Sequence, residues 1–224
     1  MCGIIGYTGS EDVREVLLDA LELLEYRGYD SAGIALRDEE SGKTEVRKCA
    51  GRVSDLRAIC ASEKVVSQCG IGHTRWATHG GVNDCNAHPH QVGKVTLVHN
   101  GIIENYRELI ADYGLADTLK SETDSEVVAA LLNRFYEGNP EEAIKKTVSK
   151  LKGTFALVIL FEDQKDVIYS TRNVSPIVAT ICKEGAMLAS DLTALCRFTN
   201  RYFVVPEYHI LKLSADKLTL TDFD

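Results

Sequence analysis

The chain has 224 residues, with 25 Lys and Arg against 33 Asp and Glu, so its formal net charge is −8. This acidic balance argues against nucleic acid and anionic membranes as partners, because a phosphate backbone would be repelled. The longest purely apolar run, residues 155–161, is far shorter than a membrane span, and the N-terminus lacks the pattern of a signal peptide. We therefore expect a cytoplasmic protein.

Periodic apolar residues predict both strands and helices in the first half of the chain. The predicted elements are a strand at 2–8, a helix whose apolar positions run from Val13 to Leu24 and which stops at Arg27-Gly28, strands at 32–38 and 44–49, a helix at 53–61, and strands at 70–76 and 94–99. Ser10 is the predicted N-cap of the first helix. A loop rich in Gly, Asn and His is predicted from 78 to 92, and the strand after it is predicted to end at Asn100-Gly101.

The second half begins with helices and continues with strands. The predicted elements are helices at 103–112, 124–137 and 140–151, followed by strands at 154–162, 167–172, 177–183, 186–190, 202–205, 208–214 and 217–222. Thr123 with Glu126 is typical of a capping box, and Pro140 suits the first position of a helix. Strands at both ends with helices between them indicate two sheets covered by helices, which is an α+β arrangement. The sequence shows no internal repeat, linker or low-complexity segment, so we expect a single domain over residues 1–224.

The cysteines argue against a disulfide framework or a zinc ribbon, because they number seven and include no CxxC pair. Cys85, His88 and His90 lie close together in sequence, but no fourth ligand follows at regular spacing. We expect no metal, and these three residues receive no assignment.

Cys2 would become the amino-terminal residue once Met1 is removed. A cysteine in that position carries a nucleophilic thiol and an α-amine that can act as its base. The position alone is a weak signal, since a small apolar residue entering a strand would look the same.

Several short segments together form a specific pattern, although each alone would be weak. They are Cys2-Gly3-Ile4-Ile5-Gly6, Tyr26-Arg27-Gly28-Tyr29-Asp30-Ser31, His73-Thr74-Arg75-Trp76-Ala77-Thr78-His79-Gly80, Asn86-Ala87-His88-Pro89-His90, His99-Asn100-Gly101 and Ser121-Glu122-Thr123-Asp124. With them the chain resembles, over essentially its whole length, the class II (N-terminal nucleophile) glutamine amidotransferases. Within these it is most similar to the glutaminase domains of glutamine–fructose-6-phosphate aminotransferases.

The resemblance implies a four-layer αββα sandwich, with two antiparallel sheets between helix layers. It also implies hydrolysis of L-glutamine to glutamate and ammonia through a γ-glutamyl thioester on Cys2, without cofactor or metal. Asn100 and Gly101 would form the oxyanion hole, against the plainer reading of Asn-Gly as a turn.

The remaining site residues are also assigned by the resemblance. Arg75 would bind the α-carboxylate of glutamine, and Asp124 would pair with its α-ammonium group in addition to favouring a helix start. Thr78 and His79 would bind substrate in a loop that closes over it.

Three further residues would shape or gate the site. Arg27 would hold Cys2 in position, Gly28 would shape the floor beside it, and Trp76 would lie by the exit toward an ammonia channel.

In full-length members of the resembling family, ammonia passes to a C-terminal sugar-isomerase region that aminates fructose 6-phosphate. That region is not in this chain, which is either a truncated piece or a stand-alone glutaminase. Three alternatives are weaker. The first is the glutaminase half of amidophosphoribosyltransferase or asparagine synthetase, the second an N-terminal-nucleophile amidase acting on another amide, and the third a non-catalytic binding module.

Overall fold

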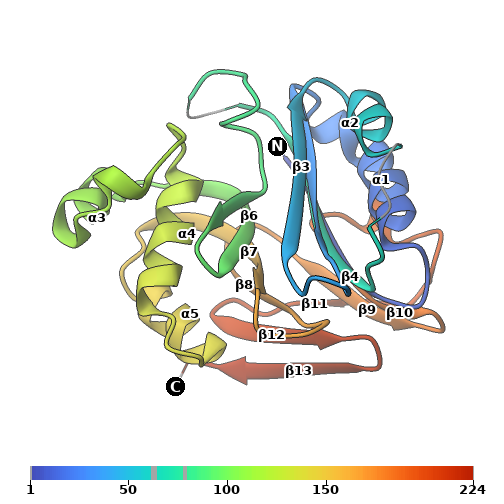
Figure 1. Cartoon of the computed structure of the whole chain (residues 1–224). Coiled ribbons are helices and arrows are strands. Elements are labelled where there is room, and N and C mark those ends of the chain that lie inside the picture. The colour runs from blue at the N-terminus through green and yellow to red at the C-terminus, as the bar shows by residue number, and fades with distance from the viewer. Residues whose placement is uncertain (1, 62–64, 78–79, 224) are drawn as a thin grey trace.

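Two antiparallel sheets with helices outside them make up the structure, a computed structural model that describes residues 2–61, 65–77 and 80–223 (Figure 1). The strand order is β11-β9-β10-β1-β4-β2-β3 in the first sheet and β13-β12-β8-β7-β6-β5 in the second. The strands of the first sheet are β1 (Gly3–Gly9), β2 (Ser31–Arg37), β3 (Thr44–Ala50), β4 (Cys69–Arg75), β9 (Val178–Cys182), β10 (Gly185–Ala189) and β11 (Phe203–Val204). The strands of the second sheet are β5 (His90–Val92), β6 (Val95–Ile103), β7 (Gly153–Phe161), β8 (Ile168–Asn173), β12 (His209–Ser214) and β13 (Lys217–Asp222).

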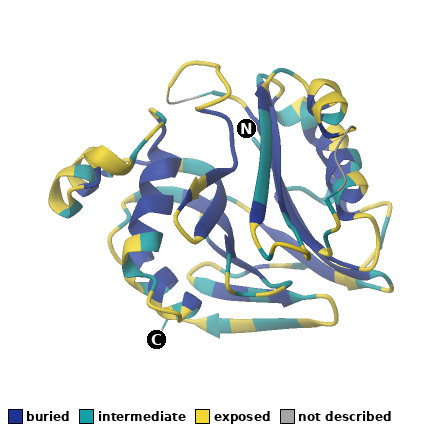
Figure 2. Cartoon of the chain, in the orientation of Figure 1, coloured by how far each residue is buried: buried dark blue, intermediate teal, exposed yellow. Residues whose placement is uncertain are grey.

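The helices cover the outer faces of both sheets. The α-helices are α1 (Val13–Leu24), α2 (Val53–Cys60), α3 (Tyr106–Tyr113), α4 (Asp124–Phe135) and α5 (Pro140–Val148), with short 3-10 turns η1 (Glu25–Arg27), η2 (Ala116–Thr118) and η3 (Leu192–Ala194). α1 and α2 pack on the first sheet, whereas α4 and α5 pack on the second (Figure 1). α3 is the most exposed of the α-helices and buries only Leu109 (Figure 2).

Alternating side chains build three apolar cores from the same strands. In β1, Ile5 packs toward α1 while its neighbour Ile4 packs between the two sheets. In β7, Leu157 packs toward α4 and Val158 packs between the sheets. Successive side chains of a strand point to opposite faces, so strands buried on both faces must be apolar throughout. The predicted α+β sandwich, with two antiparallel sheets between helix layers, is confirmed.

Two predicted boundaries are wrong. β6 does not end at Asn100-Gly101 but continues to Ile103, which pairs with Gly153 of β7, and α3 therefore begins at Tyr106 rather than 103. Pairing with β7 outweighs the local turn preference of Asn-Gly, and Gly101 tolerates its φ of 136° because it has no side chain.

Two predicted local details also differ. Asp12 rather than Ser10 caps α1, because the Ser10 hydroxyl donates to the Glu184 carbonyl instead. The predicted loop at 78–92 ends in a short strand, β5. None of the helices in the described parts of the chain combines the length and apolarity that a membrane crossing requires.

Candidate active site

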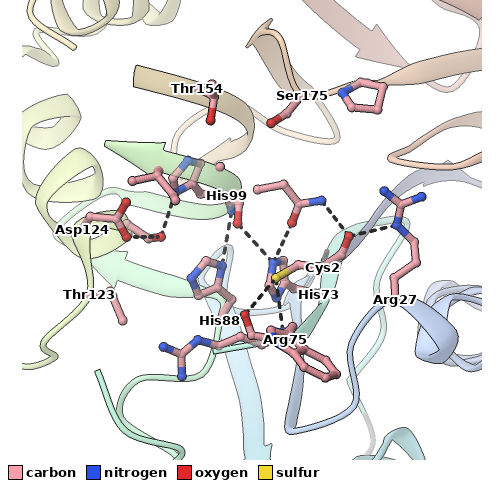
Figure 3. Close-up of a pocket in the computed structure, with 16 residues that line it drawn as sticks. Cys2, Arg27, His73, Arg75, His88, His99, Thr123, Asp124, Thr154 and Ser175 are labelled. Carbon is pink, nitrogen blue, oxygen red and sulfur yellow. Dashed lines mark hydrogen bonds between the residues drawn. The ribbon is translucent and has the colours of Figure 1, made fainter. Parts of the chain in front are cut away.

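A cavity of about 350 Å³ lies where the start of β1 and the end of β4 meet β6 and the first turn of α4 (Figure 3). This volume is in the range of small-molecule sites. Most residues assigned from the sequence line it, namely Cys2, Arg27, Arg75, Trp76, Asn100, Gly101 and Asp124. Residues more than a hundred positions apart are therefore brought to one site.

Cys2 is held by contacts to its backbone and to its thiol. Because Gly3 pairs with Thr74, Cys2 comes beside the end of β4. Its carbonyl accepts hydrogen bonds from Arg27 Nε at 3.2 Å and Asn100 Nδ2 at 2.9 Å. Its Sγ accepts a hydrogen bond from the Trp76 backbone N–H at 3.2 Å.

The environment of the Cys2 thiol keeps it protonated near neutral pH. Burial raises the pKa of the thiol above its ordinary value, and the Trp76 backbone hydrogen bond opposes this shift in part. Since the thiolate is the nucleophilic form, attack on a substrate requires a base close to the sulfur.

Arg75 and Asp124 place opposite charges on the wall of the same cavity. Both residues are buried, with 4% of their surface exposed. Arg75 Nη1 donates to the Gly81 carbonyl at 3.2 Å. Asp124 Oδ2 accepts the Ile103 backbone N–H at 2.8 Å. A ligand carrying both an anionic and a cationic group would find complementary partners here.

Half of the predicted capping box before α4 is present. Thr123 Oγ1 accepts the backbone N–H of Glu126, as predicted. The Glu126 carboxylate does not return to Thr123 but accepts the backbone N–H groups of Lys120 and Ser121. The carboxylate therefore supports the segment that leads to Asp124.

The residues predicted to shape the site pack around Cys2. Arg27 forms an ion pair with Asp191. A Cβ at Gly28 would lie 2.7 Å from the backbone carbon of Arg75, so only glycine allows this close approach. Trp76 is 51% exposed and contacts the Tyr29 ring edge-on, with ring centroids 5.6 Å apart.

Two of the predicted substrate-binding residues, Thr78 and His79, lie outside the described residues. Gly81 and Asn86, which follow them in the chain, are fixed by hydrogen bonds. The Gly81 backbone N–H donates to the Glu122 carboxylate at 3.4 Å, and Asn86 Nδ2 donates to the Gly81 carbonyl at 3.0 Å.

A cluster of buried histidines at the wall of the cavity was not assigned from the sequence. His73, His88 and His99 line the cavity. The centroid of the His88 ring lies 4.1 Å from that of the His73 ring and 4.7 Å from that of the His90 ring. Burial lowers the pKa of His73 to about 3 and those of His88 and His90 well below the ordinary value, so these rings are neutral at pH 7. The described residues include no group of three or more His, Cys, Asp or Glu placed to hold a metal ion.

Two aspartates that support the site were also missed. Asp191 lies 164 positions from its partner Arg27, so no local signal could link them. Asp30 accepts the Ala77 backbone N–H, and its own N–H donates to the Arg75 carbonyl at 3.1 Å. Asp30 belongs to the same motif as Arg27, residues 26–31, and this was the sequence signal that could have pointed to it.

Comparison with known proteins assigns the chain to a family. A family model described as a glutamine amidotransferase domain matches residues 78–197, more than half of the 224 residues. The glutamine–fructose-6-phosphate aminotransferases (isomerizing) of Halalkalibacterium halodurans and Bacillus subtilis are 45% and 42% identical to the chain. Both matches cover 100% of the chain, which spans 38% of the length of these relatives.

A solved structure shares the fold. The glutamine phosphoribosylpyrophosphate amidotransferase from B. subtilis, in complex with ADP and GMP, aligns with a TM-score of 0.83 at 24% identity. The alignment covers 100% of this chain and 49% of that one. Because the family model matches more than half of its residues, the chain belongs to the glutamine amidotransferase family.

Proposed function

We propose that the chain hydrolyses L-glutamine to glutamate and ammonia, with Cys2 as the nucleophile after removal of Met1. The observation that carries this proposal is the set of side chains that lie together around one cavity. It contains a thiol, an amide donor 2.9 Å from the carbonyl of the same cysteine, and two buried side chains of opposite charge.

Substrate binding uses the charged side chains of the cavity. Arg75 pairs with the α-carboxylate of glutamine through its planar set of donors, and Asp124 accepts hydrogen bonds from the α-ammonium group. The side-chain carboxamide then extends toward Cys2. Thr78 and His79, which follow Arg75 in the chain, complete the contacts to substrate in this proposal.

The chemical step begins at the thiol. The α-amine of Cys2 takes the thiol proton, and Sγ attacks the carboxamide carbon to give a tetrahedral intermediate with a negative oxygen. The Asn100 side-chain amide and the Gly101 backbone N–H stabilise this oxyanion. The α-ammonium group returns the proton to the leaving nitrogen, ammonia departs, and water hydrolyses the γ-glutamyl thioester.

The relatives at 42–45% identity are named as glutamine–fructose-6-phosphate aminotransferases, and these names support a proposal for the fate of ammonia in a longer protein. In the proposed longer enzyme, ammonia passes by Trp76 to a C-terminal isomerase region and aminates fructose 6-phosphate. No cofactor or metal takes part in this reaction. We place it in the cytoplasm, where the seven thiols of the chain would stay reduced.

The test is a measurement of glutamate released from L-glutamine by the purified chain. Cys2→Ala should abolish the activity, whereas Cys196→Ala, at an exposed cysteine outside the cavity, should leave it unchanged. Propionamide, which lacks both charged groups, should be a poor substrate. Hydrolysis of propionamide as fast as that of glutamine would contradict the roles of Arg75 and Asp124.

A further inference from the structure

The hydrogen bonds of His73 determine which of its ring nitrogens carries the proton. Its Nε2 lies 3.1 Å from the His99 backbone carbonyl and 3.0 Å from Asn100 Oδ1. A backbone carbonyl can only accept, so the proton of the ring must be on Nε2. Nδ1 is buried and has no hydrogen-bond partner among the described residues, so no acceptor there calls for a proton on it.

The same bonds determine the orientation of the Asn100 amide. Because Nε2 is a donor, the Asn100 atom that faces it must be the oxygen, Oδ1. Nδ2 then faces the carbonyl of Cys2 at 2.9 Å, and that carbonyl is also a pure acceptor. Rotating the amide by half a turn would set donor against donor at His73 and oxygen against oxygen at Cys2.

We propose that His73 is a positioning residue, which fixes the Asn100 amide with its N–H groups on the Cys2 side. This inference rests on the proposed function, in which Asn100 stabilises the oxyanion. An amide held in this state before the reaction needs no reorientation as the negative charge forms, which is how preorganised donors lower a barrier. A rotated amide would place an oxygen there and raise the barrier.

The surroundings of His73 suit this role. The residue is 1% exposed and lies in β4, where it pairs with Ile4 of β1 and with Gly33 of β2. Burial lowers its pKa to about 3, so the ring neither gains a second proton nor adds charge near the substrate at pH 7. The His88 ring packs against it at 4.1 Å and limits its rotation.

The test compares two amide substitutions that differ in reach. In His73→Gln the side-chain nitrogen extends to about the position of Nε2, so a donor to Asn100 is retained. In His73→Asn the nitrogen lies nearer the backbone, at about the position of Nδ1, and the donor is lost. Removing an oxyanion-hole donor costs about 10²–10³-fold in kcat, so misorienting one should cost about 10- to 100-fold.

We expect His73→Asn to lower kcat for glutamine by that factor with KM changed less than about two-fold, while His73→Gln keeps most of the wild-type kcat. In an Asn100→Ala background, His73→Asn should have no further effect, because both substitutions act through one amide. Equal kcat for the Asn and Gln variants, or an additive loss in the double variant, would overturn the proposal. Thermal unfolding of each variant separates a loss of fold from a loss of positioning.

A second measurement does not depend on turnover. Nitrogen-15 NMR of the wild-type imidazoles should show the His73 proton on Nε2 and a bare Nδ1 between pH 6 and 9. A proton on Nδ1 would refute the positioning role even in an active enzyme. Wild-type protein that fails to hydrolyse glutamine would instead refute the proposed function, and the NMR result would still decide the state of His73.

Discussion

Replacement of Asp124 by asparagine separates its proposed role in substrate binding from its support of the local backbone. Oδ2 of Asp124 accepts the Ile103 N–H at 2.8 Å, whereas Oδ1 lies 3.5 Å from Ser125 Oγ, at the limit of a hydrogen bond. Asparagine can keep its oxygen on Ile103 but loses the negative charge. Alanine loses both.

The expected effects follow from these contacts. A hydrogen bond between charged groups contributes about 1.5–3 kcal/mol, so Asp124→Asn should raise KM for glutamine about 10- to 150-fold. Asp124→Ala should raise KM similarly. It also leaves the buried Ile103 N–H without an acceptor and should lower the free energy of unfolding by about 1–3 kcal/mol more than Asp124→Asn does.

The assay uses a second substrate, 4-carbamoylbutanoate, which is glutamine without its α-ammonium group. The wild type should prefer glutamine, and this preference should largely disappear in Asp124→Asn, because the partner of the ammonium group is gone. Denaturation curves of both variants give the stability difference. A preference for glutamine that persists unchanged in Asp124→Asn would refute the pairing of Asp124 with the substrate.

Three other predictions concern processing, backbone geometry and pH. Mass spectrometry of active protein should show Met1 absent, because a retained methionine converts the Cys2 amine into an amide; activity with Met1 fully retained would contradict this. Gly101→Ala should lower the free energy of unfolding by roughly 2–4 kcal/mol, since φ is 136° and a Cβ would lie 2.0 Å from a backbone oxygen. Gly114→Ala is the matched control, with φ at 59° and nothing within 4 Å of its Cβ, and it should cost only about 1 kcal/mol. The pKa of His73 is about 3 in the folded protein, whereas the unfolded chain takes up the same proton near the ordinary value of about 6.5. The free energy of unfolding should therefore fall as pH drops from about 6.5 toward 3. His73→Gln should make that fall shallower in denaturation curves measured at each pH.

Much of this protein was determined by its sequence alone. Elements such as the helix Val13–Leu24 and the strand Gly153–Phe161 follow from apolar periodicity and composition, because burial on one helical face or on both faces of a strand dictates which positions are apolar. The motifs around Cys2, Arg75 and Asp124 predicted the chemistry of the site through family resemblance. Their roles stay predictions, although the structure gathers these residues around one cavity.

Only the tertiary structure decided what depends on distant partners. The extension of β6 past Asn100 required β7 beside it, and the ion pair of Arg27 required Asp191 at a remote position. The proton on His73 and the orientation of the Asn100 amide depend on carbonyls supplied by His99 and by Cys2. Local sequence sets the preference of each segment, but hydrogen bonds and burial between segments exist only after folding, and at these points they outweigh or complete the local signal.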